Sequence, residues 1–145
     1  MVSAALAVAL GEIAAAILAA AAAVHLFWAL GGRWGKNLAV PEKANKGGPA
    51  MRPGAIGTLI VAAALTVAAG FVFIRIGVLD LSLPVWLPRT VCVVLALVFL
   101  GRAIGDRRYV GFFKRVRGTR FARLDTAVYS PLCLFLAMAV GVNAW

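Results

Sequence analysis

The stretch AALAVALGEIAAAILAAAAAVHLFWAL, residues 4–30, decides the fold class of this chain. It consists almost entirely of Ala, Leu, Ile and Val, and it exceeds the roughly 20 residues that a helix needs to cross the hydrocarbon core of a bilayer. A secretory signal peptide is the competing interpretation, and it would carry Lys or Arg before the apolar stretch. Here Arg33 and Lys36 follow the stretch and no basic residue precedes it. We therefore expect a membrane helix whose N-terminus lies outside.

Three more apolar runs follow, at residues 55–78, 85–104 and 125–145. Pro131 lies inside the last run, and a helix that began only there would reach about 22 Å, less than a hydrocarbon core of about 30 Å. We therefore expect this helix to begin at Asp125 as its N-cap and to kink at Pro131, where the Ser130 hydroxyl helps to satisfy the backbone. The sequence predicts an all-α integral membrane four-helix bundle, a single membrane domain over residues 1–145.

The composition agrees with that prediction and excludes several other classes of protein. Hydrophobic residues make up 63% of the chain and charged residues 14%, whereas a soluble domain has about 45–50% and about 25%. The net charge is +10, but nucleic-acid binding needs a soluble basic face, so no nucleic-acid partner is predicted. Cys92 and Cys133 lie inside apolar runs, with no CxxC motif and no nearby histidine. Neither a metal site nor a cofactor is predicted.

The basic residues are distributed unevenly along the chain. Thirteen of the fifteen lie in or beside the first and third connections between the runs, and only Arg75 and Arg89 lie near the second. Because lysine and arginine are retained on the cytoplasmic side of a membrane, this asymmetry predicts that both basic connections are cytoplasmic and both termini outside. The predicted location is the cytoplasmic (inner) membrane, which the chain crosses several times.

The third connection contains the stretch DRRYVGFFKRVRG, residues 106–118. At helical spacing its aromatic residues and Val116 share one stripe about 100° wide, and the basic residues lie off that stripe. The pattern predicts a short amphipathic surface helix over residues 106–117, with rings in the membrane and cations toward anionic headgroups. A solvated loop that only sets the topology is the alternative. The cations expected to bind lipid or phosphate are Arg107, Arg108, Lys114, Arg115 and Arg117.

Acidic side chains are few, so each is a candidate for a specific role. Asp106 and Asp125 bracket the basic stretch, and we expect ion pairs there that pin the surface helix to the third and fourth spans. Glu12 is the only acid well inside an apolar run. We expect it to pair with Arg75 or Arg89. A proton site in a small proton-coupled transporter is the alternative role for Glu12.

His25 is the only histidine, and it lies near the cytoplasmic end of the first span. A hydrogen bond to a neighbouring helix is the simplest role for a polar residue there. The alternative is a membrane enzyme that acts on a lipid or quinone, with His25 as acid or base and Tyr129 or Asp106 assisting. One histidine per chain does not supply two axial ligands, so no haem is expected.

Three motifs resemble one family of small membrane proteins. They are HLFWALGGRWG at residues 25–35, RPGAIGTLIVAAAL at residues 52–65 and RAIGDRRYVGFFKRVRGTRFARLDTAVYSPLC at residues 102–133. The family that they resemble is bacterial, common in actinobacteria, and catalogued as a domain of unknown function. The resemblance covers nearly the whole chain and implies a four-helix protein of the bacterial inner membrane without an established activity. The positions that match the family signature are His25, Trp28, Gly31, Trp34, Gly105, Asp106, Tyr109, Asp125, Tyr129 and Pro131.

These observations favour a non-catalytic function over an enzyme or a transporter. The basic cytoplasmic face is expected to bind membrane lipids with anionic headgroups, or a partner protein in the membrane. A second copy of the chain is one such partner. The alternatives with His25 and Glu12 at their centres stay open at this point, because the sequence alone places neither side chain against a second functional group.

Overall fold

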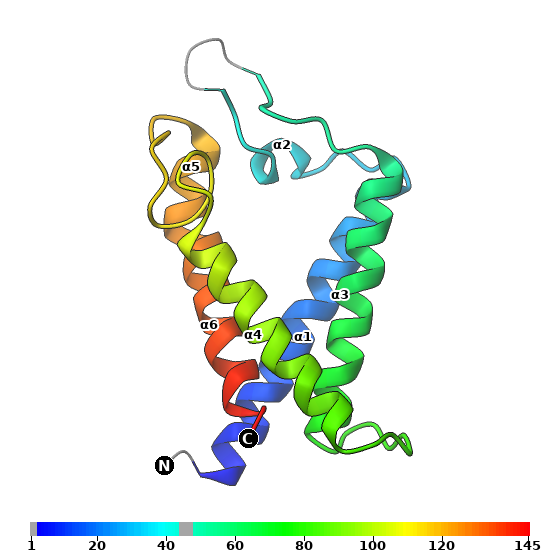
Figure 1. Ribbon diagram of the computed structural model, residues 1–145. Helices are drawn as coiled ribbons and strands as arrows, with labels where there is room; N and C mark the ends of the chain where they lie inside the picture. The colour runs from blue at the N-terminus through cyan, green and yellow to red at the C-terminus, as the bar shows by residue number, and fades with distance from the viewer. Residues whose placement is uncertain (1–2, 44–47) are drawn as a thin grey trace.

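The computed structural model describes residues 3–43 and 48–145. Within these residues four helices are long and apolar enough to cross a membrane. Three of them are α1 (Ala4–Ala29), α3 (Ala55–Arg75) and α4 (Trp86–Ile104). The fourth runs from Arg120 to Val142 and consists of α5 (Arg120–Leu124), a π-helical turn η1 (Asp125–Tyr129) and α6 (Ser130–Val142). The prediction of an all-α protein with four such helices is confirmed (Figure 1).

The fourth helix begins earlier than predicted. Its N-cap is Thr119, whose Oγ1 accepts a hydrogen bond from the N–H of Ala122 at 3.1 Å, whereas Asp125 lies buried inside the helix. The helix widens into the π-turn just before Pro131, and the Ser130 N–H there donates to the carbonyl oxygen of Asp125. Proline has no N–H to donate, so one backbone hydrogen bond of the helix is missing at Pro131. The wider turn accommodates this missing bond without ending the helix. The Ser130 hydroxyl donates to the Asp125 side chain, at 3.2 Å, and not to the backbone.

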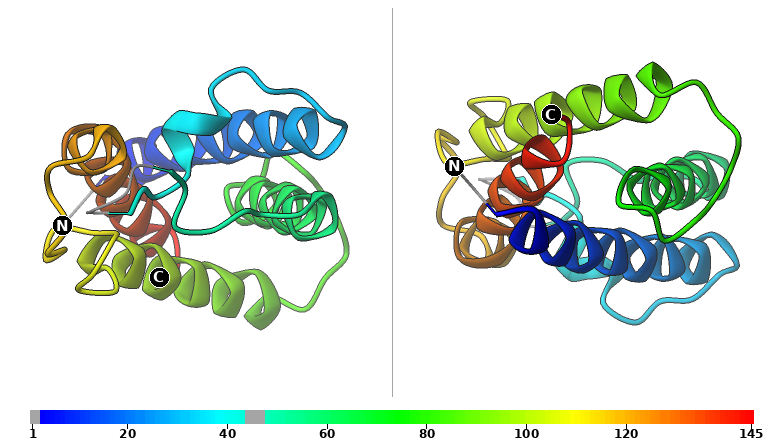
Figure 2. Two further views of the ribbon diagram at one scale, coloured as in Figure 1. Left: turned by 90° about the horizontal axis from the view of Figure 1, so that it is seen from above. Right: turned by 90° about the horizontal axis from the view of Figure 1, so that it is seen from below.

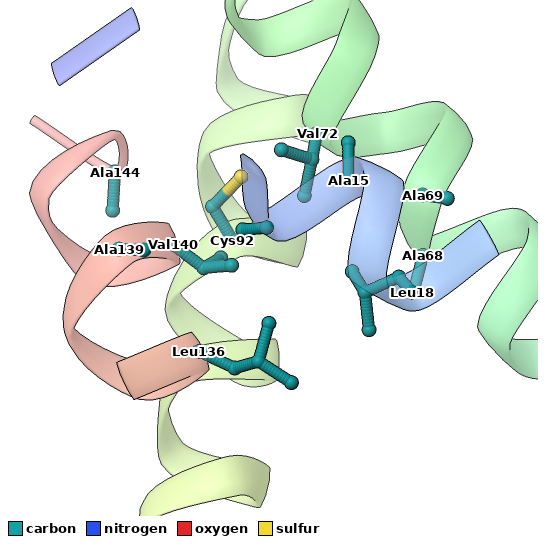
Figure 3. Close-up of a cluster of buried hydrophobic side chains, with 11 residues drawn as sticks. Ala15, Leu18, Ala68, Ala69, Val72, Cys92, Leu136, Ala139, Val140 and Ala144 are labelled. Atoms are coloured by element: carbon teal, nitrogen blue, oxygen red, sulfur yellow. The ribbon is translucent and has the colours of Figure 1, made fainter. Parts of the chain in front are cut away.

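The four long helices pack as two pairs, α1 with α3 and α4 with α6 (Figures 1 and 2). Small buried residues dominate the contact between the pairs, because in lipid small side chains let helix backbones approach closely. The shared core lies in the middle of α1, the second half of α3, the first half of α4 and the end of α6 (Figure 3). Its members are Ala14, Ala15, Leu18, Ala68, Ala69, Val72, Cys92, Leu136, Ala139, Val140 and Ala144.

The connections alternate between two ends of the bundle. Residues 30–43 and 48–54, which include the short helix α2 (Lys36–Ala39), and residues 105–119 lie at one end, called here the basic end (Figure 1). Residues 76–85, the start of α1 and the residues that follow α6 lie at the other, the terminal end (Figure 1). The described basic residues of the first and third connections therefore gather at one end of the molecule. The two helix pairs hold together toward the terminal end and diverge toward the basic end (Figure 1).

Residues 106–117 form no helix, so the predicted amphipathic surface helix is wrong. The reason lies in the backbone. Gly105, Arg107 and Gly111 have φ angles of 88°, 63° and 87°, in the left-handed region that a right-handed helix does not contain. A Cβ atom on Gly105 would overlap the carbonyl oxygen of Val110, because the chain folds back closely on itself there. The third connection is a compact loop.

Candidate functional site: a buried charge cluster at the basic end

A buried carboxylate, that of Asp125, organises the basic end. Arg102 Nη2 donates to its Oδ1 at 2.8 Å. The Lys114 ammonium and the Gly111 N–H donate to its Oδ2 at 2.9 and 2.8 Å, and the Ser130 hydroxyl adds a longer bond at 3.2 Å. Two of these donors are cations, so both carboxylate oxygens are ion-paired. The pairing and the additional hydrogen bonds offset the cost of removing this charge from water.

Lys114, which was expected to face lipid headgroups, is buried instead and only 2% exposed. Besides its ion pair with Asp125, its ammonium donates to the carbonyl oxygen of Gly111 at 2.9 Å and to Thr126 Oγ1 at 2.6 Å. An ammonium has three donors, and all three are engaged here. Lys114 therefore holds the loop together, and its ammonium is not available to an external anion.

The local sequence brings the loop and the fourth helix together. Asp125 opens the π-turn η1, a widened helical turn of the kind that is frequent at functional sites. On the loop side, the N–H of Phe112 donates to the carbonyl oxygen of Ala103 at 2.8 Å, which returns the chain to the end of α4. Gly105 and Gly111 lie so close that a Cβ atom on either would collide with the backbone of the other. Only glycine at both positions permits this approach.

Asp106 shapes the exposed side of the same loop. Its Oδ1 accepts the backbone N–H groups of Arg108, Tyr109 and Val110 at 2.8, 2.7 and 3.0 Å. Slight burial raises the pKa of Asp106, but these hydrogen bonds outweigh that effect and hold the pKa below its ordinary value. Both ion pairs among the described residues belong to Asp125. The expected pairing of the loop acids is therefore present at Asp125 and absent at Asp106.

The remaining cations of the loop are exposed. The Arg108 guanidinium lies over the Tyr109 ring, 5.1 Å from its centroid, and Arg117 Nε donates to the carbonyl oxygen of Lys114 at 3.2 Å. The Phe113 ring is 65% exposed. An exposed ring among exposed cations is typical of a surface that meets the headgroup region of a membrane. The exposed cations of the loop are Arg107, Arg108, Arg115 and Arg117.

Arg102 is the charged member of the cluster that the sequence analysis did not single out. It lies in the last turn of α4, and its Nη1 is buried with no hydrogen-bond partner among the described residues. A buried donor without an acceptor costs roughly 1–3 kcal/mol, so this atom marks where the cluster can take one more acceptor. A signal for Arg102 was available, because a cation at the end of an apolar run needs a nearby carboxylate. Gly111 and Thr126 carry no comparable signal.

The three residues proposed as catalytic candidates are not brought together. His25 Nδ1 lies 2.8 Å from the carbonyl oxygen of Ala21 in its own helix, and the expected bond to a neighbouring helix is absent from the described residues. The Tyr129 hydroxyl donates to the carbonyl oxygen of Leu38 at 3.3 Å, which ties η1 to α2. The Asp106 carboxylate accepts hydrogen bonds from backbone N–H groups of its own loop. Among the described residues no hydrogen bond joins any two of these three side chains.

Glu12 is exposed on α1 and does not form the expected ion pair with Arg75 or Arg89. The two arginines instead meet Trp145. Arg75 Nη2 donates to its carbonyl oxygen at 3.2 Å, and the Arg89 guanidinium lies 4.7 Å from the centroid of its ring. Gly11, one residue before Glu12, faces Ile76 of the bundle. Successive residues on a helix are about 100° apart, so Glu12 is turned away from that contact.

The fold and the cluster together define a class: an all-helical protein with four membrane-span-like helices, whose basic end is held by a buried ion cluster. Comparison with protein families narrows that class. The chain belongs to the family described as "Protein of unknown function (DUF3995)", whose model matches residues 18–140. The matched range contains the whole cluster around Asp125 and agrees with the resemblance of the three sequence motifs. No curated protein and no solved structure matches the chain.

Proposed function

We propose that this is a multi-pass protein of the bacterial cytoplasmic membrane whose basic end lies in the cytoplasm and binds anionic lipid headgroups. One observation carries the proposal. The Lys114–Asp125 ion pair fixes the third connection as a folded loop, and four arginines of that loop remain exposed. None of the four forms an ion pair with another described residue. Their charge is therefore available to an external anion.

Elementary electrostatics supports a lipid as that anion. The loop joins α4 to α5, so in a bilayer it lies at the boundary between hydrocarbon and water. A cation near an anionic leaflet contributes about 1 kcal/mol of attraction. A loop that is already folded loses little conformational entropy when it binds. The exposed ring of Phe113 adds apolar contact at the same boundary.

The enzyme and transporter alternatives draw less support from the geometry. An enzyme would need His25 within reach of Tyr129 or Asp106, and these side chains have separate hydrogen-bond partners. A proton-coupled transporter would need Glu12 beside a pathway through the bundle, and Glu12 is exposed on the flank of α1. Lipid binding is therefore the function that we take to experiment.

The test compares lipid selection by wild type and by a variant in which Arg107, Arg108, Arg115 and Arg117 are replaced by glutamine. Each protein is purified in neutral detergent, mixed with equal amounts of phosphatidylglycerol and phosphatidylcholine, and examined by native mass spectrometry for retained lipid. Wild type should retain phosphatidylglycerol preferentially. Each substitution should reduce that preference by about fivefold, which corresponds to about 1 kcal/mol. The preference should also shrink as salt is added, because exposed charges are screened.

The control variant removes the two cations of the terminal end, as Arg75→Gln and Arg89→Gln. It lowers the net charge without touching the loop, and it should keep the lipid preference of wild type. Equal retention of both lipids by wild type would overturn the proposal. An unchanged preference in the four-arginine variant would move the binding surface away from this loop.

A further inference from the structure

The connection between α1 and α3 holds a second charged feature at the basic end, a cavity of about 560 Å³. The sequence analysis assigned no ligand to the residues that line it. Three of them are basic, Arg33, Lys36 and Arg52, and one is acidic, Glu42. The volume lies within the range of about 300–1,000 Å³ that is typical of small-molecule sites.

The walls of this cavity are tied to the rest of the fold. The two arms of the connection pair through backbone hydrogen bonds, from Lys43 N–H to the Gly48 carbonyl oxygen at 3.0 Å and from Ala50 N–H to the Pro41 carbonyl oxygen at 2.6 Å. The bond from the Tyr129 hydroxyl then fastens α2 to the fourth helix. The cations are therefore presented by a folded segment at the basic end (Figure 1).

The charge of the cavity is unbalanced. None of the four charged residues that line the cavity forms an ion pair with another described residue. Three cations and one carboxylate leave a net charge of two positive units among the described lining residues. Like charges gathered around one space repel one another, so an anion of matching charge would bind there favourably.

We infer that this cavity binds a phosphate monoester. Such a group carries about 1.5 to 2 negative charges at neutral pH, which matches the cavity, whereas a phosphodiester carries one. Arginine suits this ligand because its planar guanidinium can donate two parallel hydrogen bonds to phosphate oxygens. Met51, which lines the cavity, is 60% exposed, and Trp34, the residue after Arg33, is 80% exposed, as expected for side chains at a membrane surface. The inference rests on the proposed cytoplasmic membrane surface and names a second anion site on it.

Two sources can present this chemistry, a lipid headgroup and a soluble phosphate. The test therefore titrates the intact protein in neutral detergent, by isothermal calorimetry, with three probes. Short-chain phosphatidic acid is the monoester lipid, short-chain phosphatidylglycerol is the diester lipid, and inorganic phosphate is the soluble anion. Wild type should bind phosphatidic acid about fivefold more tightly than phosphatidylglycerol, because the additional negative charge of the monoester attracts one more cation of the cavity, which is worth about 1 kcal/mol.

Two triple variants with the same change of charge then locate the site. In the cavity variant Arg33, Lys36 and Arg52 become glutamine, and in the control variant Lys43, Arg120 and Arg123 do. The control residues are exposed cations of the same end that do not line the cavity. The cavity variant should bind phosphatidic acid about a hundredfold more weakly, at about fivefold for each cation, and the control variant about as tightly as wild type. Circular dichroism and thermal unfolding check that both variants fold.

Each outcome of this experiment either supports or overturns the binding of a phosphate monoester in the cavity. Tight inorganic phosphate binding that competes with phosphatidic acid identifies a soluble ligand for the same cavity. Unchanged affinity in the cavity variant, equal affinity for the two lipids, or no binding of any probe overturns the inference. These results are separable from the loop test. If phosphatidic acid binding depends on the cavity while the four-arginine variant keeps its lipid preference, the proposed loop function fails and the cavity stands.

Discussion

Asp125 is the sixth residue of a helix that is apolar enough to cross a membrane, and its environment explains how a carboxylate can lie there. It pairs with two cations, and the cluster therefore carries an excess of positive charge. The two partners differ in burial: the Lys114 side chain is 1% exposed, whereas that of Arg102 is 32% exposed and can reach water. Lys114 is thus the partner whose loss leaves the carboxylate least compensated.

The first prediction concerns Lys114. Lys114→Met keeps the apolar stem and removes the charge and all three hydrogen bonds. Breaking a buried ion pair typically costs about 3–5 kcal/mol. Because Arg102 still pairs with Asp125, we expect a loss of about 3 kcal/mol in the free energy of unfolding. Titration with a denaturing detergent, followed by tryptophan fluorescence, measures it.

Arg115→Met is the matched control, since it removes an exposed cation from the next position of the loop. It should change the free energy of unfolding by no more than about 0.5 kcal/mol. A loss as small as this in Lys114→Met would show that the ion pair does not hold the loop. A double variant of Lys114→Met with Asp125→Asn should lose less than the sum of the two single losses, because the partners interact.

The sequence predicted that Asp125 would be ion-paired but not which cation would pair with it. Several arginines and one lysine lie within the third connection, and all are chemically competent. The choice of Lys114 follows from the close approach of Gly105 and Gly111, which is a tertiary contact. The spacing of residues along the sequence does not predict that contact, so Lys114 was assigned to the surface together with the neighbouring arginines.

At the scale of elements, the long helices and the third connection illustrate opposite cases. The long helices were predicted well, because a run of some twenty apolar residues has few structures available in a membrane. The connection has helical periodicity over residues 106–117 but folds as a loop. Asp106 takes the N–H groups of the following turn, and Arg107 adopts a left-handed conformation. Periodicity detects a helical face. It does not detect a side chain that accepts hydrogen bonds from backbone N–H groups and so competes with helix formation.

The second prediction concerns the pH dependence of that loop. The pKa of Asp106 is lower in the folded loop than in an unfolded chain. Its contribution to stability is therefore complete above the unfolded value of about 3.9 and is lost as the pH falls through the lower, folded value. Hydrogen exchange should show the amides of Arg108, Tyr109 and Val110 protected at neutral pH and losing protection below about pH 4.

Asp106→Asn keeps an acceptor oxygen without a titratable charge, so it should remove the pH dependence of these amides. Asp80→Asn, in the connection at the terminal end, should leave that dependence unchanged. The same acid-induced loss of protection in Asp106→Asn would assign the titration to another group and contradict the role given to Asp106.

The start of the fourth helix shows a second limit of local rules. Thr119 and Asp125 are both good N-cap residues, and the sequence offers no basis for ranking them beyond the start of the apolar run. The structure uses Thr119 as the cap and Asp125 as the buried acceptor. Arg120 and Arg123 are consequently in the first turn of the helix and exposed. The ion cluster, which forms only after folding, decides between the two caps.

At the scale of the whole molecule, packing and charge are segregated. The core that joins the two helix pairs (Figure 3) lies toward the terminal end, whereas the Asp125 cluster and the cavity lined by Arg33, Lys36 and Arg52 are built from residues of the basic end. Alanine makes up more than half of the shared core, and both ion pairs of the described residues lie at the basic end, where the helix pairs diverge. The end that holds the helix pairs together is therefore different from the end to which we assign binding.

The last prediction is the orientation of this segregated molecule in the membrane. A chain whose four long helices each cross the membrane has its first and third connections on one side, and its second connection and both termini on the other. The first side has nearly all of the lysine and arginine, and such residues near the ends of membrane helices are retained in the cytoplasm.

A phosphatase reporter fused after Trp145 should therefore be active, as it is only in the periplasm. A fluorescent reporter inserted near Lys46, which lies outside the described residues, should fluoresce as it does in the cytoplasm. The opposite pair of readings would place the exposed arginines and the cavity outside the cell, where the proposed cytoplasmic leaflet is absent. Because orientation follows charge and not packing, replacing core residues such as Leu18 should lower the yield of the protein without exchanging the two readings.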